Sequence, residues 1–458
     1  MICFAQRNHA CSGVASHDST DIQKIKENNI IKQSTRLRWD GMLAERGTGK
    51  RMSMELSESS LDLLNELIKG ESVARPELSR RLSVTAPTVG SGLRALQAAG
   101  LVVQTGAQKG PMGRTAALFG LSKRAGWVLG VDFGSTQVVV AARALNGASL
   151  GTEQHSVGLA SEALEGPTNG LVEAAKELVA RLIEKFSPTH GNLLSVGIAL
   201  PHVVPNEVDY DTYISWDGNP IRVSSLLETI GVPSDVPVLL ENNTNCAALA
   251  ELAEGRAVNV KNFLYLQIGV RIGAGIVSDG RLHRGARGAG GELALLPFPF
   301  APAESNGDPI TFGLEQHVGS ESLMRRVRGA WSLEAIDAPR DVKELFALSE
   351  GGHRLSQEFT ARHVQVVAQV ALTVVAILDP ELVVLGGGVG QSPVLVPRVR
   401  ALVNAMNRDV EVVPSLLGDR GTAEGAAFLA GEFARVEILG ERRYGSTIAA
   451  KRSTIVMA

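Results

Sequence analysis

The stretch WVLGVDFGSTQVVVAARAL, residues 127–145, holds two apolar runs separated by a short polar turn. Each run has the length and valine content of a strand, and Gly134 begins the break between them. The stretch therefore predicts a strand, a tight turn and a second strand. A strand that ends in Asp-x-Gly-Ser-Thr offers N–H groups and hydroxyls to an anion, and the Asp132 carboxylate to a metal. Many hairpins carry Gly and Ser for turn reasons alone, so the motif by itself is weak.

The residues that follow this hairpin alternate between the helical and the strand period. Helices are expected over 162–186 and 355–378, and a buried strand over 193–201. Three further segments read as strand, turn and helix (236–255), as two strands about a glycine turn (263–277), and as a strand running into a glycine loop (381–389). This order predicts an α/β domain pair with a cleft between its halves.

A different pattern precedes the hairpin. Leu61, Leu64, Leu67 and Ile68 recur at helical spacing, and further short helices are expected over 75–82 and after Thr85, an N-cap followed by proline. Residues 101–103 and 116–121 read as strands around a glycine-rich loop. Three helices with a tight turn between the second and third, followed by a β-wing, predict a winged helix-turn-helix.

Charge is distributed unevenly along the chain. Residues 75–125 hold eight Lys and Arg against one acidic residue, whereas residues 126–458 hold 27 against 37. A basic module ahead of an acidic body predicts that one end binds a polyanion such as DNA. The expected DNA contacts are Thr85, Thr88, Ser91 and Arg94 on the third helix and Lys109 and Arg114 on the wing. The alternative is a helix-turn-helix that contacts only protein.

Composition places the chain among globular proteins, with 44% apolar and 20% charged residues in 458. No apolar run reaches membrane-spanning length, no secretory signal is evident, and the three cysteines are too scattered for disulfides or zinc, so a cytoplasmic protein is expected. The expected divisions are a disordered extension (1–52), a DNA-binding domain (53–124), an α/β domain (125–436) and a disordered tail (437–458). A start codon placed too early is the alternative for the extension, since Met52 and Met54 stand where the pattern begins.

Five motifs then follow one another in a characteristic order. They are GVDFGST (130–136), PVLLENNTNCAALAE (237–251), GARGAGGELALL (285–296), GLEQHVGS (313–320) and DPELVVLGGGV (379–389). With the helix-turn-helix and wing in front, residues 56–435 resemble the ROK family of repressors and sugar kinases. The resemblance implies the actin-like, ribonuclease-H-like ATPase fold in two lobes, and the winged helix implies the regulator branch. It also implies that Asn242, Asn243, Glu292 and Glu315 contact the ligand.

The departures from the family pattern concern catalysis. Asn243 stands where the kinases have the aspartate that takes the proton from the sugar hydroxyl, and loss of a general base costs about 10²–10⁴ in rate. The phosphate loop Gly-Thr-Gly-x-Gly is altered over 269–273, the lysine after the first Gly-Thr is Gln137, and the family's histidine is Leu295. Residues 298–314 contain no Cys or His for a zinc site. We therefore expect no catalytic residues, no metal and no cofactor.

The sequence thus predicts a DNA-binding regulator, a repressor, with a sugar or sugar phosphate as effector in an inactive kinase cleft. A homodimer or dimer of dimers is expected, because two half-sites give a winged helix its specificity. In this reading Arg271 could hold the phosphate of a sugar phosphate; alternatively it fills the vacated nucleotide pocket or pairs with Asp132. An ATP-dependent sugar kinase, and a regulator whose cleft binds no effector, are the alternative functions.

Overall fold

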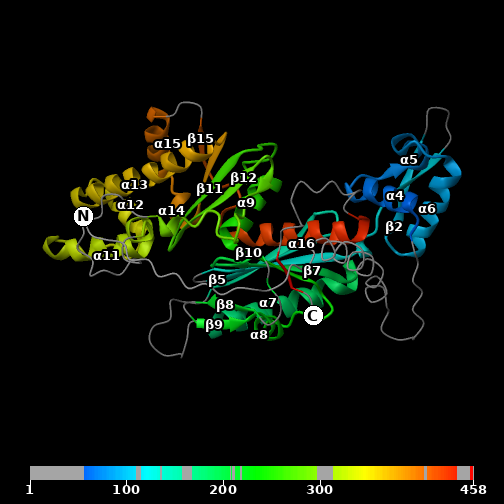
Figure 1. Ribbon diagram of the computed structural model, residues 1–458, viewed down its shortest axis with the longest axis horizontal. Helices are drawn as coiled ribbons and strands as arrows, with labels where there is room; N and C mark the ends of the chain where they lie inside the picture. Colours follow the sequence, from blue (N-terminus) through cyan, green and yellow to red (C-terminus); the bar gives the residue numbers. More distant parts are fainter. Residues whose placement is uncertain are drawn as a thin grey trace, which may run out of the picture. The chain divides into compact units, whose positions relative to one another are not determined.

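The computed structural model describes residues 56–440 and 454–456, apart from 110–114, 135–136, 157–167, 207, 209–211, 217–218, 297–312 and 407–409 (Figure 1). The expected disorder of residues 1–52 falls outside these residues. The first described elements form the helix-turn-helix with its wing: α4 (Glu58–Ile68), β1 (Val73–Ala74), α5 (Arg75–Leu82), α6 (Ala86–Ala98), β2 (Val102–Lys109) and β3 (Thr115–Leu121). The predicted winged helix-turn-helix is confirmed.

Local sequence explains where these helices begin and end. Ser57 caps α4 and Thr85 caps α6, each by accepting a hydrogen bond from the backbone of the third residue that follows. Ser83 lies between α5 and α6 in the left-handed region, with φ of 55°, which turns the chain sharply between the two helices. The apolar stripes of α4 and α6 then meet in a small core that includes Leu64 and Leu93, both fully buried.

The wing is longer than the sequence predicts. The expected strands 101–103 and 116–121 are Val102–Lys109 and Thr115–Leu121, paired antiparallel up to Lys109 and Thr115. Every side chain of β2 after Val102 is exposed. The second half of this strand is therefore held by its backbone ladder and leaves no apolar alternation in the sequence.

The first lobe is built on a six-stranded sheet of order β16-β10-β7-β4-β5-β6, in which β4, β7 and β10 run parallel. Helices α7 and α8 cover one face of this sheet, and their apolar sides share its core. The elements of this lobe are β4 (Trp127–Phe133), β5 (Gln137–Ala144), β6 (Ser149–Ser156), α7 (Thr168–His190), β7 (Leu193–Leu200), β8 (Tyr213–Trp216), β9 (Asn219–Arg222), α8 (Val223–Thr229), β10 (Val238–Asn242) and β16 (Thr454–Val456).

The second lobe is built on a five-stranded sheet of order β13-β12-β11-β14-β15. Helices α10 to α15 pack around one core with it. The elements are β11 (Phe263–Ile268), β12 (Ile272–Ser278), β13 (Arg281–Leu282), α10 (Glu315–Val318), α11 (Ser320–Ala330), α12 (Val342–Glu350), α13 (Arg354–Leu378), β14 (Leu382–Gly386), α14 (Gly387–Gly390), α15 (Leu395–Met406) and β15 (Glu411–Pro414). The predicted α/β fold in two halves is confirmed.

Two helices, α9 (Asn243–Glu254) and α16 (Gly421–Leu439), lie side by side between the sheets (Figure 1). Glycines allow this close packing: a Cβ at Gly425 of α16 would lie 1.8 Å from the Cys246 carbonyl oxygen of α9. A Cβ at Gly130 of β4 would lie 2.1 Å from the Ala423 carbonyl oxygen of α16. Any larger side chain at either position would therefore push these elements apart.

The C-terminal region differs from the predicted disordered tail. Helix α16 continues to Leu439, and Thr454–Val456 form a strand that pairs antiparallel with β10, Leu239 opposite Ile455. The triplet Thr454–Val456 is too short to stand out as a strand, and it becomes one because β10 presents a free edge. Residues 441–453 and 457–458 of the predicted tail lie outside the described residues.

Among the described helices, α13 alone has the length and apolar composition of a membrane span. Buried residues recur along it from Ser356 to Val375 and belong to the core of the second lobe. It is therefore a core helix, as its sequence predicts.

Candidate DNA interface and ligand cleft

The outward face of α6 carries the polar residues that the sequence singles out for DNA contact. Thr85, Ser91 and Arg94 are exposed and Thr88 is half-buried, while Val89 faces the core. The Thr85 and Thr88 hydroxyls lie 2.8 Å apart, and the Ser91 hydroxyl donates to the Thr88 carbonyl oxygen at 3.0 Å. The helix therefore presents hydroxyls and one guanidinium together on its solvent side, as a base- and phosphate-reading helix requires.

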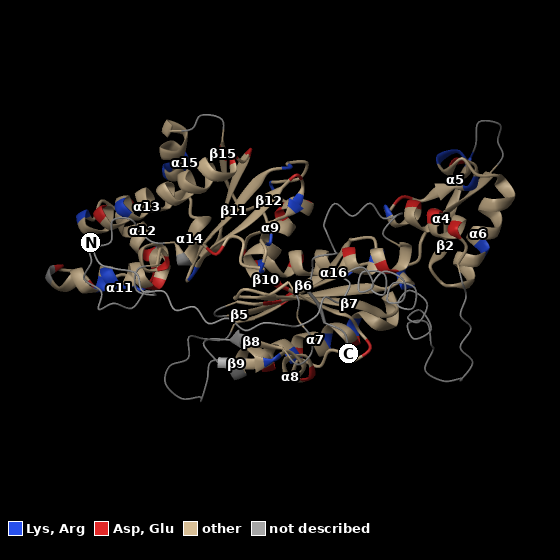
Figure 2. Cartoon of the chain, viewed as in Figure 1, with Lys and Arg blue, Asp and Glu red and all other residues tan. Residues whose placement is uncertain are grey.

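Some basic residues of the helix-turn-helix and wing form ion pairs with acidic side chains, and others do not. Lys and Arg residues mark α5 and α6, and acidic residues mark α4 (Figure 2). Arg80 and Arg81 both bond to Glu77, which lowers the pKa of that carboxyl to about 2. Arg94 and Lys109 form no ion pair with another described residue, so their charge is available to a phosphate. Arg114 lies outside the described residues.

Asn242 is held by the fold at the start of α9. Its side-chain oxygen accepts hydrogen bonds from the backbone of Thr244 (2.9 Å) and Asn245 (3.2 Å), and its side-chain nitrogen donates to the His202 carbonyl oxygen at 3.2 Å. The amide therefore caps the helix. Its expected contact with a ligand stays a prediction. That contact would use the second hydrogen of the side-chain NH₂ group, which does not donate to His202.

Asn243 follows as the first residue of α9 and is half-buried. Its side-chain oxygen accepts from the Thr244 hydroxyl at 3.3 Å, and its side-chain nitrogen has no hydrogen-bond partner among the described residues. A neutral amide here can donate to a hydroxyl but cannot remove its proton near neutral pH.

Three of the expected ligand residues come together on the second lobe: Arg271, Glu292 and Glu315. Burial raises the pKa of Glu292, the neighbouring Glu315 raises it further, and Arg271 lowers it. Burial likewise raises the pKa of Glu315, against Arg271 and an N–H bond from Ile272. Arg271 also reaches the first lobe, where it donates to the Pro201 carbonyl oxygen at 3.2 Å. One exposed cation therefore lies within reach of two half-buried carboxylates.

Close backbone packing places this cluster beside the first turn of α9. Gly291 has φ of 90°, and its carbonyl oxygen accepts from the Ala274 N–H at 2.9 Å; a Cβ at Gly291 would lie 1.8 Å from the Ala274 carbonyl oxygen. Strand β12 in turn lies against α9, since a Cβ at Gly273 would be 2.9 Å from the Thr244 hydroxyl. These glycines therefore set Glu292 next to the helix that Asn243 begins.

A buried ion pair that the sequence analysis did not identify joins the loop after β13 to β10. Arg284, in the loop that leads to Glu292, lies 2.9 Å from Glu241 of β10 and donates to the Val204 carbonyl oxygen at 3.2 Å. Glu241 also accepts from Asn245 at 3.0 Å. Burial raises the pKa of Glu241, and Arg284 acts against that rise. In the sequence, an arginine next to a glycine-rich run could have indicated a structural role for Arg284. Only the fold shows that its partner is Glu241.

The corner that would hold a nucleotide contains Asp132 at the end of β4. Burial, with the neighbouring Asp419 as a smaller cause, raises the pKa of Asp132 to about 7. Ser135 and Thr136 of the same motif lie outside the described residues, as do most of residues 298–314, where the sequence excludes zinc. Within the described part of the chain, no group of three or more His, Cys, Asp or Glu side chains could hold a metal ion.

A sequence profile of the ROK family matches residues 128–432. The chain belongs to the ROK family. A xylose repressor from Bacillus subtilis (strain 168) is 24% identical over 380 residues, covering 79% of this chain and 92% of the repressor. An N-acetyl-D-glucosamine kinase from Shigella flexneri is 26% identical over 273 residues, covering 57% of this chain and 87% of the kinase.

Solved structures of the ROK family share the fold. A ROK transcriptional regulator, a homologue of the E. coli MLC protein, matches with a TM-score of 0.63 at 20% identity, over 85% of this chain and 99% of its own. The ROK hexokinase from Thermus thermophilus matches with a TM-score of 0.51 at 27% identity, over 66% of this chain and 97% of its own. These matches confirm the two-lobed sugar-kinase-like fold, and the regulator match extends over more of the chain.

Proposed function

We propose that the protein is a transcriptional repressor that binds operator DNA through α6 and the wing and releases it when a sugar occupies the cleft. The observation that carries this proposal is the exposed polar face of α6 together with Asn243, an amide at the position where the kinases of the ROK family have the proton-accepting aspartate. The matched xylose repressors support both the direction of regulation and the class of effector. The protein would act in the cytoplasm, where the operator lies.

The charges of the cleft favour a neutral sugar over a sugar phosphate. Arg271 is the cation that the sequence offers for a phosphate, but Glu292 and Glu315 both act on it. A phosphate would add negative charge to a cluster that already contains two carboxylates for one guanidinium. Carboxylates instead accept hydrogen bonds well from sugar hydroxyls, and Asn243 can donate one more.

We also propose that the protein has no kinase activity, although family members include kinases. Asn243 cannot act as the general base. Asp132 shares its buried corner with Asp419, and a pKa of about 7 leaves it about half protonated near pH 7, which weakens its hold on a metal ion. Both features act against phosphotransfer at neutral pH.

A homodimer would place two winged helices on an inverted repeat. Helices α13 and α15 pack against each other and expose Ile377 (75% exposed) and Met406 (78% exposed), and Leu378 and Leu402 on the same helices are partly exposed. Apolar side chains so exposed on neighbouring helices are typical of a protein interface. We propose that this surface, the α13–α15 face, joins two copies of the chain.

The proposal is tested with a DNA duplex that the protein itself selects from a random-sequence pool. Fluorescence anisotropy then measures binding of that duplex with and without D-xylose, D-glucose and N-acetyl-D-glucosamine, and ATP turnover is measured with the same sugars. We expect one sugar to weaken DNA binding, and no turnover above background. Sugar-dependent ATP turnover would support the kinase, and DNA binding that ignores every sugar would support a regulator with an unused cleft.

A further inference from the structure

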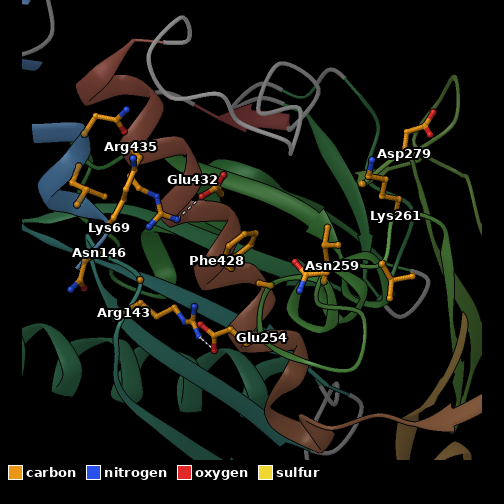
Figure 3. A pocket seen from close by; sticks show the side chains of 17 residues that line it. Lys69, Arg143, Asn146, Glu254, Asn259, Lys261, Asp279, Phe428, Glu432 and Arg435 are labelled. Atoms are coloured by element: carbon orange, nitrogen blue, oxygen red, sulfur yellow. Dashed lines mark hydrogen bonds and ion pairs between the residues drawn. The ribbon is translucent and has the colours of Figure 1, made fainter. Parts of the chain in front are cut away.

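A crevice of about 700 Å³ separates α4, the first helix of the DNA-binding module, from the two lobes (Figure 3). Lys69 lines it from just beyond α4, Asn146 from the turn between β5 and β6, and Glu254 from the end of α9. Most of the side chains that line it are polar or charged. The ion pairs along the crevice are formed by Arg143 with Glu254 and by Arg435 with Glu432.

One of these pairs connects three elements of the fold. Arg143 of β5 is only 3% exposed, and its guanidinium bonds to Glu424 of α16 at 2.8 Å. Figure 3 shows its second bond, to Glu254 of α9. Thr152 of β6 also donates to Glu424, at 3.0 Å. The Arg143–Glu424 pair is buried on both sides, so water screens its attraction little, whereas the Glu254 side chain is half-exposed. Glu254 thus links the end of α9 directly to Arg143 of β5.

Helix α9 extends from the ligand cleft to this pair. It begins at Asn243 and ends at Glu254, a length of about 18 Å at 1.5 Å per residue. Its first half is tightly packed, with Thr244 against Gly273, Cys246 against Gly425 and Ala248 against Gly275. A helix packed so closely moves as a unit, so a shift at its first turn reaches its last.

The turn after β5 faces the DNA-binding module. Arg435 of α16 donates to the Leu145 carbonyl oxygen at 2.9 Å and pairs with Glu432 at 2.5 Å. Asn146 follows in the same turn, and its side-chain nitrogen lies 4.0 Å from where a Cβ of Gly70, just beyond α4, would be. The turn is thus anchored to α16 and adjoins the end of α4.

We propose that the Arg143–Glu254 ion pair couples the ligand cleft to the DNA-binding module. This inference rests on the proposed function. Effector binding at Asn243 and Glu292 shifts α9, Glu254 passes the shift to Arg143, and the β5–β6 turn changes the position of α4 and thereby of α6. Glu254 is a positioning residue, since it contacts neither the sugar nor the DNA.

The variant Glu254→Gln tests this coupling. Glu254 is chosen because its side chain is 48% exposed, whereas a change at Arg143 would leave Glu424 buried without its counter-charge. Calorimetry measures the affinity for the responsive sugar, and anisotropy measures the affinity for the selected duplex with and without it. We expect both separate affinities to stay within about twofold, while the factor by which sugar weakens DNA binding falls at least about fivefold. A variant that was merely less stable would not lower this factor while leaving both separate affinities unchanged.

Glu350→Gln is the matched control. Its side chain is 55% exposed and pairs with Arg398 on the second lobe, so the same change in charge and shape is made away from the crevice. Glu254→Asp is a second variant, in which the carboxylate is drawn back by one methylene and an intermediate coupling factor is expected. If the wild type responds to sugar and Glu254→Gln responds equally, the coupling is refuted while the proposed function stands. If the wild type responds to no sugar, the proposed function fails, and the coupling with it.

Discussion

Replacing Asp132 by Asn should stabilise the α/β body above neutral pH and leave it nearly unchanged in acid. Burial, and secondarily Asp419, raise the pKa of Asp132 from 3.8 to about 7. The folded chain therefore binds more protons than the unfolded chain between these two pH values, and its stability falls as the pH rises through this window. A shift of about three units at 1.36 kcal/mol each is about 4 kcal/mol. Relaxation of the site reduces this free-energy difference, so we expect about 2–4 kcal/mol.

Urea unfolding at pH 4.5 and pH 8 measures this effect, with tryptophan fluorescence as the signal. Trp127 is fully buried in the same strand, β4, so it reports on the structure around Asp132. The variant minus wild-type difference in unfolding free energy should grow by about 2–4 kcal/mol between the two pH values. Terms that do not depend on pH, such as the hydrogen bonding of the new amide, cancel in that comparison.

Asp419→Asn is the control, and it should reproduce only part of the pH dependence, since burial is the larger cause. DNA binding and its response to sugar should survive Asp132→Asn, because neither uses this carboxylate. An unchanged difference between pH 4.5 and pH 8 would show that Asp132 is ionised at neutral pH in the folded chain. The argument against a metal-bound nucleotide in this corner would then lose its basis.

Three further outcomes follow from the site and the surface. Alanine at Arg94 or Lys109 should weaken duplex binding and lower its salt slope by about one, because each of these cations neutralises one phosphate; equal binding by the body from Trp127 onward would contradict the assignment. Aspartate at Asn243 should leave phosphotransfer at background in a coupled ATP assay, since the phosphate loop is altered too, and measurable turnover would restore the kinase alternative. Ile377→Lys should convert the dimer to a monomer in sedimentation, and an unchanged dimer would exclude the α13–α15 face.

The helix-turn-helix could be predicted in detail because its signals are local. Thr85 caps α6 through its own side chain, and the apolar stripe of α4 has the period of the helix that it forms. The wing was underestimated because the second half of β2 is exposed on both sides and is held by backbone pairing alone. The strand at Thr454–Val456 was missed for the related reason that an edge of β10, distant in sequence, makes it a strand.

The sequence by itself also determined which chemistry is present: Asn243 in place of the base, Arg271 in the phosphate loop, and no thiol or imidazole over 298–314. Only the tertiary structure decided how these groups are used. It placed Arg271 near Glu292 and Glu315, assigned Asn242 to capping, and brought Arg143 to Glu254 from 111 positions away. The physical reason is that the charge state and partners of a side chain depend on burial and on neighbours that only folding brings near.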